Sequence, residues 1–302
     1  MKYIVTGGSG MVGKHLQKLM PELTYLSSKD CDLTNEQEVQ KLFADHRPDG
    51  VIHLAARVGG ILENMKYPAD FYDQNIKINS NVLIACREHG VKKMLSILST
   101  CMYPDVVEQY PMTEDDFHKG PPAKANFSYA YTKRCMAVQI DAYRSQDGLD
   151  YNYLIPCNLY GEYDNFADLT KSHFITALIK KIIIAEQKGE KSISLFGTGT
   201  PLRQFMHTED LARVIQHVIE NDISESFNVA PPNQNFSIDE MARITLQSLG
   251  KTDWRIDYDS EKPDGQYRKD VSCEKMLKHL PNFKFLPLHE GVLRVYNSLK
   301  KS

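Results

Sequence analysis

The sequence predicts an α/β protein built on a doubly wound parallel sheet, with a smaller C-terminal lobe. Two observations carry this prediction. Short apolar runs alternate with longer helical patterns through the first half of the chain, and this rhythm loosens after about residue 156, where loops become rich in Asn, Gly and Pro. Such alternation implies parallel strands joined by right-handed crossovers. In this architecture ligands bind beyond the carboxyl ends of the strands.

Each element has its own signal in the sequence. The predicted strands are short apolar runs at Lys2–Thr6, Thr24–Ser27, Val51–Ala55, Met94–Leu98, Tyr151–Ile155 and, in the smaller lobe, Ser192–Phe196. The predicted helices have apolar residues spaced by three, four and seven, and cover Met11–Met20, Pro68–His89, Ser128–Gln146 and Ser237–Leu249. Gly90 and Gly148 suit helix ends, and Ser128 is predicted to be an N-cap.

Composition excludes several classes of protein. The 302 residues are 42% hydrophobic and 25% charged, which rules out a disordered, collagen-like or disulfide-stapled chain. A net charge of −3 argues against nucleic acid as a partner. The longest apolar run, near residues 182–185, is far short of the roughly 20 residues that span a bilayer, so no membrane partner is expected.

The start of the chain and its cysteines indicate the compartment. Lys2–Thr6 leads directly into glycines, so we expect no signal peptide. The six cysteines are scattered and form no metal-binding pattern, so we expect a cytoplasmic protein with reduced thiols and no metal. Five of them are expected only to fill space, and Cys101 is the one with a candidate chemical role.

A glycine-rich turn lies between the first predicted strand and the first predicted helix. Gly8, Gly10 and Gly13 have the dinucleotide-binding spacing, and Gly7 completes a wider variant of it. Glycine allows the tight turn, the approach to a pyrophosphate and the packing of helix on strand. The helix N-terminus then faces the pyrophosphate. We therefore expect a Rossmann-type dinucleotide site here; a purely structural glycine turn is the alternative.

The end of the second predicted strand bears on cofactor choice. An Asp or Glu there holds the ribose 2′-hydroxyl of NAD. Here Ser27, Ser28 and Lys29 end the strand, and two hydroxyls with an ammonium favour a 2′-phosphate, so NADP(H) is predicted. Asp30 leaves NAD open, because a small shift of register would bring its carboxylate to the ribose. Asp32 and Leu33 are expected near the adenine.

A candidate catalytic group follows the fourth strand. Tyr129 and Lys133 are four residues apart on one predicted helical face, and Ser99 ends the strand Met94–Leu98. A neighbouring ammonium lowers the pKa of a tyrosine phenol, and a serine hydroxyl can hold a carbonyl oxygen. Together the three groups suit protonation of a carbonyl that receives hydride from a nicotinamide.

These motifs, with others, resemble the extended short-chain dehydrogenases and, among them, the GDP-L-fucose synthases. The similar stretches cover nearly the whole chain: His53–Gly60, Asn64–Pro68, Ser99–Pro104, Tyr129–Lys133, Pro156–Gly161, Asp164–Phe166, Gly197–Phe205 and Lys262–Gly265. The glycine turn and the Tyr/Lys pair are shared across the superfamily. The run Val58–Gly60, the cysteine two residues after Ser99, and Asp164–Phe166 followed by a histidine are more specific.

The resemblance implies an NADP(H)-dependent enzyme that converts GDP-4-keto-6-deoxy-D-mannose to GDP-L-fucose by 3,5-epimerisation and 4-keto reduction. It implies catalytic roles for Ser99, Cys101, Tyr129, Lys133 and His173, with Cys101 and His173 moving protons at C3 and C5. It implies cofactor contacts from Gly7, Gly8, Ser9, Gly10, Met11, Val12, Gly13, Ser28, Lys29, Asp32, Leu33, Lys133, Pro156, Asn158, Leu159 and His173. It implies substrate contacts from Asn165, Lys181, Phe196, Arg203 and Asp264.

The same resemblance implies an arrangement of domains and subunits. We expect an NADP-binding domain over residues 1–156, completed by parts of 204–230, and a mainly substrate-binding lobe over 157–302. Helices near residues 70–89 and 129–146 are expected to pair in a homodimer.

Two alternatives stay open. One is another nucleotide-sugar epimerase, reductase or dehydratase; a dehydratase of this superfamily carries an Asp-Glu pair where this chain has Thr100 and Cys101. The other is a non-catalytic Rossmann protein, and such proteins tend to lose the Tyr or the Lys, both of which are present here.

Overall fold

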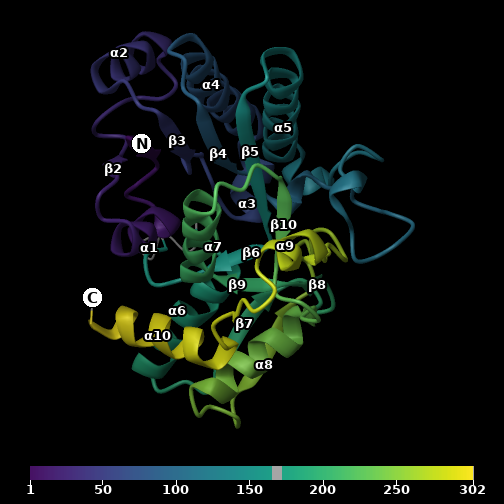
Figure 1. Ribbon diagram of the computed structural model, residues 1–302. Coiled ribbons are helices and arrows are strands. Elements are labelled where there is room, and N and C mark those ends of the chain that lie inside the picture. The colour runs from purple at the N-terminus through teal and green to yellow at the C-terminus, as the bar shows by residue number, and fades with distance from the viewer. Residues whose placement is uncertain (165–171, 302) are drawn as a thin grey trace.

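A six-stranded sheet forms the upper half of the molecule (Figure 1), as the computed structural model describes it for residues 1–164 and 172–301. Its strands are all parallel, in the order β10-β5-β4-β3-β1-β2. They are β1 (Tyr3–Thr6), β2 (Thr24–Leu26), β3 (Gly50–His53), β4 (Lys93–Ile97), β5 (Asp150–Pro156) and β10 (Phe227–Val229). The predicted doubly wound parallel sheet is therefore confirmed.

Helices cover both faces of this sheet. On one face α2 (Glu36–His46), α4 (Pro68–Glu88) and α5 (Phe127–Asp147) lie side by side, and on the other α1 (Met11–Leu19) packs against α7 (Thr208–Glu220) (Figure 1). The strands are buried on both faces, as their continuous apolar runs require. Local caps fix some of the ends; the Asn35 side chain, for example, accepts the backbone N–H groups of Gln37 and Glu38 at the start of α2.

The rest of the chain forms a smaller lobe below the sheet (Figure 1). Its helices are α6 (Phe174–Gln187), α8 (Ile238–Ser248) and α10 (Leu288–Lys301), while α9 (Glu274–His279) contacts β10. Three two-stranded pairs complete it: β6 (Asn158–Tyr160) with β9 (Phe205–His207), β7 (Ser192–Phe196) with β12 (Arg255–Asp259), and β8 (Leu202–Arg203) with β11 (Phe236–Ser237). Side chains of α6 bridge its two apolar clusters, because Ile179 and Ile183 lie in one, and Leu178 and Ile182 lie in the other.

Short segments connect these elements around the carboxyl edge of the sheet. They are α3 (Ile61–Lys66) and three 3₁₀ turns at Thr100–Met102, Glu114–Asp116 and Lys124–Asn126. In the part of the chain that the structure describes, no helix is both long and apolar enough to span a bilayer.

Two expectations about single residues are wrong. Ser128 is not an N-cap: α5 begins at Phe127 after Asn126, and the Ser128 hydroxyl is buried in its first turn without a hydrogen-bond partner among the described residues. The 3₁₀ turn at Lys124–Asn126 leads directly into the helix, so the N-cap lies two residues earlier than the serine pattern suggests. Cys135 is exposed rather than filling space, because it lies on the outer face of α5.

Candidate functional site

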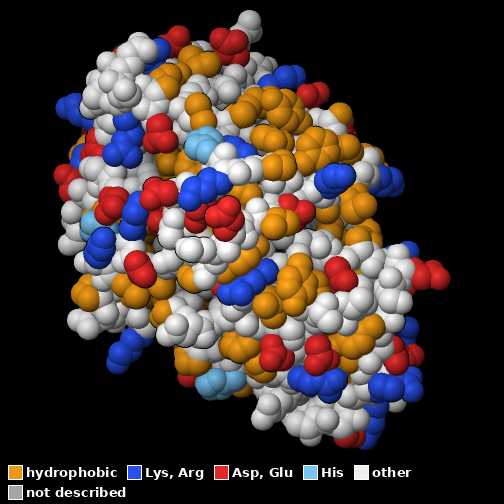
Figure 2. Space-filling model, turned by 90° about the vertical axis from the view of Figure 1, so that its right-hand side faces the viewer, with side chains coloured by type: hydrophobic (Ala, Val, Ile, Leu, Met, Phe, Trp, Pro, Cys, Tyr) orange, Lys and Arg blue, Asp and Glu red, His pale blue; other side chains and the backbone are white. Residues whose placement is uncertain are grey.

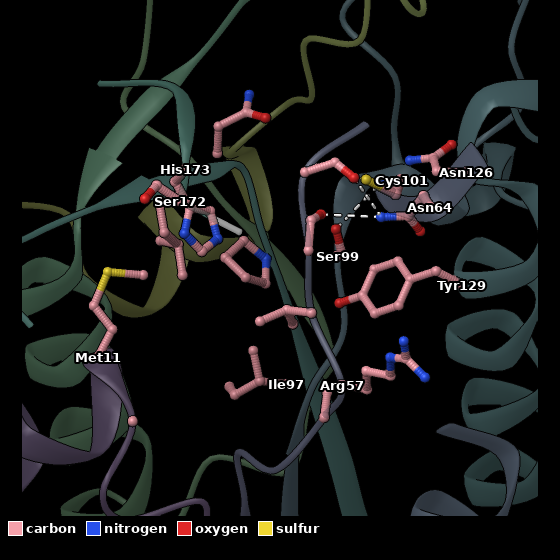
Figure 3. A pocket seen from close by; sticks show the side chains of 18 of the residues that line it. Met11, Arg57, Asn64, Ile97, Ser99, Cys101, Asn126, Tyr129, Ser172 and His173 are labelled. Carbon is pink, nitrogen blue, oxygen red and sulfur yellow. Dashed lines mark hydrogen bonds between the residues drawn. The ribbon is translucent and has the colours of Figure 1, made fainter. Parts of the chain in front are cut away.

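One large cavity lies between the two lobes, beyond the carboxyl ends of β1, β4 and β5. Its volume is about 1240 Å³. Figure 3 shows Ser99, Cys101 and Tyr129 on one side, His173 and Ser172 across from them, and Met11 at the start of α1 on the same side as His173. The predicted site residues that line it are Gly7, Ser9, Gly10, Met11, Val12, Gly13, Ser28, Asp32, Leu33, Ser99, Cys101, Tyr129, Lys133, Pro156, Asn158, Leu159, His173, Lys181, Phe196, Arg203 and Asp264. Asn165 lies outside the described residues.

The glycine turn has the geometry of a dinucleotide cradle. Gly7 has a φ of +73°, and a Cβ there would come within 2.9 Å of the backbone of Leu54 and Ala55. A Cβ on Gly13 would lie 2.4 Å from the carbonyl oxygen of Gly8, so only glycine lets α1 pack this closely on the turn. Gly10 caps α1 with no side-chain cap from the described residues, which leaves first-turn N–H groups for an anion in the cavity.

Gly8 has a packing role instead. It is not among the described residues that line the cavity; its N–H donates to the Leu26 carbonyl at 2.8 Å, and a Cβ would touch the Tyr25 side chain. Its lack of a side chain therefore lets the turn approach β2.

The turn after β2 separates the four polar residues considered for the ribose. Asp30 accepts hydrogen bonds at 2.7 Å from both the N–H and the hydroxyl of Ser27, so these two side chains satisfy each other. Ser28, Asp32 and Leu33 line the cavity. Lys29 is exposed and does not line the cavity formed by the described residues, although it directly follows Ser28. The flexible side chain of Lys29 could reach a phosphate group that lies beside Ser28.

The Tyr129 phenol is held in its protonated form. Burial raises the pKa of this phenol above its usual value, and the neighbouring Cys101 thiolate raises it further. Lys133 does not oppose this shift, because its Nζ donates to the Ile97 carbonyl at 2.8 Å, 5.9 Å from the centre of the tyrosine ring. Burial also lowers the pKa of Lys133 to about 8. The expected lowering of the tyrosine pKa is therefore absent, and the protonated phenol suits a proton donor.

Cys101 has the opposite environment. It lies in the 3₁₀ turn after β4, its N–H donates to Ser99 Oγ at 3.2 Å, and its Sγ lies 3.7 Å from Nζ of Lys269. Burial raises the pKa of this thiol, but the charge of Lys269, the Ser99 hydroxyl and the charge of Arg203 outweigh burial and lower it overall. The site thus favours a thiolate that can act as a base.

His173 is the residue before α6, in an extended conformation. Its Nδ1 lies 3.1 Å from Oδ1 of Asp164, and its backbone N–H donates to Oδ2 of the same carboxylate at 2.9 Å. The Asp164 side chain is 5% exposed and the His173 side chain 33% exposed, so the imidazole edge reaches the cavity while the carboxylate lies behind it.

Four of the predicted substrate residues line the cavity from the smaller lobe: Lys181, Phe196, Arg203 and Asp264. Burial lowers the pKa of Arg203 to about 10, so the guanidinium keeps its charge at neutral pH. Lys181 Nζ lies 4.8 Å from the centre of the Phe196 ring, which is 44% exposed. Asp264 is already engaged, because its carboxylate accepts the backbone N–H and the hydroxyl of Thr198 at 2.7 and 2.9 Å.

Asn158 has a structural hydrogen bond as well as its place at the cavity. Its side-chain amide donates to the Gln204 carbonyl at 2.8 Å, which ties β6 to the segment before β9. Pro156 and Leu159, on either side of it, line the same wall of the cavity.

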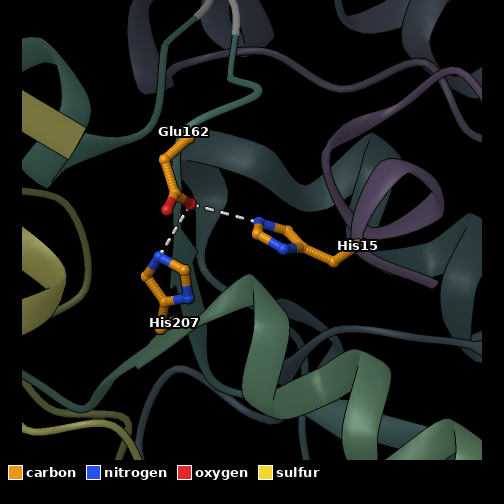
Figure 4. A group of neighbouring side chains, drawn as sticks. All are labelled: His15, Glu162 and His207. Carbon is orange, nitrogen blue, oxygen red and sulfur yellow. Dashed lines mark ion pairs between the residues drawn. The ribbon is translucent and has the colours of Figure 1, made fainter. Parts of the chain in front are cut away.

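A second polar cluster lies behind the site. His15, Glu162 and His207 meet with Glu162 Oε2 3.2 and 3.0 Å from the two Nε2 atoms (Figure 4). The set has the residue types of a metal site. However, His207 Nδ1 accepts the backbone N–H of Glu209, so in the neutral ring Nε2 carries the proton. Neither Nε2 atom nor Glu162 Oε2 has a hydrogen-bond partner of regular geometry among the described residues. In this tautomer Nε2 of His207 has no free lone pair for a metal ion, so we describe the three side chains as an ion-pair cluster and not as a metal site.

Sequence reasoning missed two residues of the site. Lys269 is 168 positions from Cys101, and no spacing connects them; the only signal is the basic pair that follows the stretch Lys262–Gly265. Asp164 belongs to a stretch that resembles the family, but no sequence pattern indicates that it contacts His173, nine positions later.

Comparison with known proteins agrees with this geometry. Residues 3–230 match the family described as "NAD dependent epimerase/dehydratase family". A GDP-L-fucose synthase of Dictyostelium discoideum is 38% identical over 298 residues, covering 96% of this chain and 92% of that one. A GDP-L-colitose synthase of Yersinia pseudotuberculosis is 35% identical over 89% of this chain and 88% of its own.

Solved structures show the same likeness. The crystal structure of a GDP-L-fucose synthetase from Naegleria fowleri bound to NADP has a TM-score of 0.86 and 31% identity, covering 99% of this chain and 94% of that one. The family match covers most of the chain, and relatives that align with nearly all of it are more than 30% identical. The protein belongs to the NAD dependent epimerase/dehydratase family.

Proposed function

We propose that this protein is an NADP(H)-dependent enzyme that epimerises GDP-4-keto-6-deoxy-D-mannose at C3 and C5 and then reduces its C4 ketone, forming GDP-L-fucose. One observation carries the proposal: Cys101, with a lowered thiol pKa, and His173 line the same cavity as the Ser99, Tyr129 and Lys133 group. A reductase alone needs no thiol base. The relatives named GDP-L-fucose synthase support the choice of sugar.

The epimerase half uses acid and base groups on opposite sides of the cavity (Figure 3). Hydrogens beside a ketone are acidified because the charge left on carbon moves to the carbonyl oxygen. Ser99 and Tyr129 are the groups that would hold this oxygen. Cys101 and His173 then provide one group to remove a proton from carbon and one to return a proton to the other face.

The reductase half uses the protonated phenol. NADPH, when bound, supplies the hydride that a ketone carbon accepts. Tyr129, whose pKa burial raises, donates its proton to the carbonyl oxygen. Burial lowers the pKa of Lys133 to about 8, so the desolvation cost of keeping its ammonium charged in the site is limited. The side chain can then lie beside the charge on that oxygen and beside a ribose.

The two ligands would bind at different parts of the cavity: NADP(H) at the glycine turn and the GDP-sugar beside the smaller lobe. The glycine turn and the N-terminus of α1 suit the pyrophosphate of NADP(H), while Ser28 and Lys29 suit its 2′-phosphate. Arg203 and Lys181 offer cations for the diphosphate of a GDP-sugar, and Phe196 offers an aromatic face. In this assignment residues 1–156, with parts of 204–230, bind the cofactor, and 157–302 mainly bind the sugar nucleotide.

We also propose that two copies pair through α4 and α5. Phe127, Tyr131 and Val138 of α5 and Tyr72 of α4 are exposed large hydrophobic side chains. Figure 2 shows hydrophobic side chains gathered on the upper half of the face that includes α5. A solution mass of one chain would contradict this pairing.

The thiols, all free among the described cysteines, suit the cytoplasm.

The decisive experiment separates carbon exchange from reduction. With NADP⁺ in place of NADPH, in deuterated water, the protein should exchange the hydrogens at C3 and C5 of GDP-4-keto-6-deoxy-D-mannose without reducing it. Cys101→Ala should lose most of this exchange while keeping NADPH binding. Cys157→Ala is the matched control, because that thiol also lines the cavity but burial raises its pKa, so exchange should persist.

Two outcomes would contradict the proposal. Exchange at the unaltered rate in Cys101→Ala would leave a simple keto-sugar reductase. No exchange in the unaltered protein, with turnover of another GDP-sugar ketone, would favour an alternative within the family, such as the activity named for the colitose relative.

A further inference from the structure

We propose that Asp164 is a positioning residue for His173: its carboxylate fixes the imidazole in the Nδ1–H tautomer and so leaves Nε2 to exchange protons with substrate carbon. The inference rests on the proposed function, because it concerns the histidine assigned there to epimerisation. Asp164 itself does not line the cavity formed by the described residues, so it would act through the ring it holds.

The carboxylate grips the histidine at two points. Oδ1 lies 3.1 Å from the ring Nδ1, and Oδ2 accepts the backbone N–H of the same residue at 2.9 Å. Side chain and backbone of His173 are thereby fixed by one buried group, which is 5% exposed. A charge at this position also lies beside the N-terminus of α6, where the helix dipole favours an anion.

The contact dictates where the ring proton lies. An ionised carboxylate can only accept hydrogen bonds, so Nδ1 facing Asp164 must carry the proton. In the neutral ring Nε2 then has a free lone pair. When Nε2 takes a proton from carbon, the ring becomes an imidazolium whose charge Asp164 balances. In the opposite role the imidazolium gives its Nε2 proton to carbon after Cys101 has removed one from the other face, and the Nδ1–H form returns. In either role, proton exchange with water resets both groups.

Glu162, two residues before Asp164, holds the same segment of chain in place through its own contacts. Glu162 Oε2 contacts His15 of α1 and His207 before α7 (Figure 4), and Glu162 Oε1 accepts from Arg294 Nε of α10 at 2.8 Å. The short segment 162–164 is thus tied to the cofactor-binding helix and to the smaller lobe at once. A base whose support is fixed before substrate arrives needs little reorganisation in the reaction.

The test compares three variants in the exchange reaction with NADP⁺ in deuterated water. Asp164→Asn should slow exchange roughly 10- to 100-fold with little change in KM, because an amide can offer oxygen to only one of the two donors and turns its NH₂ toward the other. Asp164→Glu, which restores a group that only accepts, should recover part of the rate. NADPH affinity should change less than the exchange rate in both variants, since the glycine turn is untouched and His173 is only one of the expected cofactor contacts.

Asp116→Asn is the matched control. Its carboxylate also accepts a backbone N–H, from Thr113 at 2.7 Å, but it lies in a 3₁₀ turn and contacts no histidine among the described residues. It should exchange like the unaltered protein. The control therefore shows what the loss of a carboxylate that accepts a backbone N–H does without a histidine contact.

A spectroscopic measurement decides the tautomer without any turnover. In protein labelled with ¹⁵N-histidine, the signals missing from His173→Gln identify the His173 ring. We expect the protonated nitrogen to be Nδ1 in the unaltered protein and the two tautomers to mix in Asp164→Asn. An Nε2–H tautomer in the unaltered protein overturns the proposal, even where Asp164→Asn does not fold.

The kinetic and spectroscopic results also separate this proposal from the proposed function. If the unaltered protein shows no exchange, the proposed function fails, and the labelled spectrum still decides whether Asp164 sets the tautomer. If the unaltered protein exchanges and Asp164→Asn does so at the same rate, the positioning role is wrong while the proposed function stands.

Discussion

Nζ of Lys269 lies 3.7 Å from Sγ of Cys101, although 168 positions separate the two residues in the sequence. The lysine comes from the smaller lobe and the cysteine from the turn after β4. The contact therefore joins the two lobes at the wall of the cavity that both residues line. Burial lowers the pKa of this lysine, while the neighbouring thiolate opposes that change. The ammonium of Lys269 therefore lowers the pKa of the thiol, and the thiolate in turn favours the ammonium.

Replacing Lys269 by Met should move the pH dependence of exchange. If the Cys101 thiolate acts as a base, as proposed, the rate rises with pH through the thiol pKa, and Lys269 keeps that rise at lower pH than an ordinary thiol would give. Without the ammonium the rise should move to higher pH, and the rate at pH 7 should fall by about ten-fold for each pH unit that the midpoint of the rise moves upward. Lys262→Met, on an exposed residue seven positions earlier, should leave the profile in place. An unmoved profile in Lys269→Met would assign the base to another group.

Tyr129→Phe should separate reduction from binding. The ring stays and the proton donor is lost, so NADPH affinity should persist while NADPH oxidation with the keto sugar falls by about 10²-fold or more. Tyr131→Phe, two residues along α5 and partly exposed, is the control and should reduce normally. Absorbance of the reduced nicotinamide follows both. Reduction at the control rate by Tyr129→Phe would place the proton donor elsewhere.

Lys29→Gln should affect the two cofactors differently. If the ammonium meets the 2′-phosphate beside Ser28, NADPH binding should weaken by about 1–3 kcal/mol, and NADH binding should hardly change. Lys41→Gln is the control, because that lysine pairs only with Asp45 on the surface among the described contacts. Titration with both cofactors measures the difference, and an equal loss for NADPH and NADH would remove Lys29 from the phosphate site.

Gly13→Ala should damage the fold and the cofactor site together. The added methyl would lie 2.4 Å from the Gly8 carbonyl oxygen, so α1 must move off the turn, at a cost of about 1–3 kcal/mol in the free energy of unfolding. NADPH affinity should fall with it, because the helix N-terminus is displaced. Gly120→Ala meets only an ordinary contact at 3.4 Å with Pro104 and should change neither quantity measurably. Denaturant unfolding and cofactor titration report the two effects; unchanged values for Gly13→Ala would contradict the close packing of α1 on the turn.

The sequence by itself determined the order of elements in the first half and the local motifs. Strands β1, β3, β4 and β5 lie within a residue or two of the predicted runs, because burial on both faces leaves a continuous apolar signature. The glycine turn could be identified because its constraint is local: each glycine is needed by backbone only a few residues away or on the next strand. Tyr129 and Lys133 share a face because a helix repeats every 3.6 residues.

Only the tertiary structure decided which distant groups meet. The Lys269–Cys101 pair, the Asp164–His173 contact and the anchor of Glu162 on His15 and His207 each join segments from different elements. No periodicity records such contacts, because they depend on how whole lobes pack. The pKa of Tyr129 shows the same limit: the Tyr–Lys spacing predicts a lowered value, but burial raises it, and burial is a property of the folded chain.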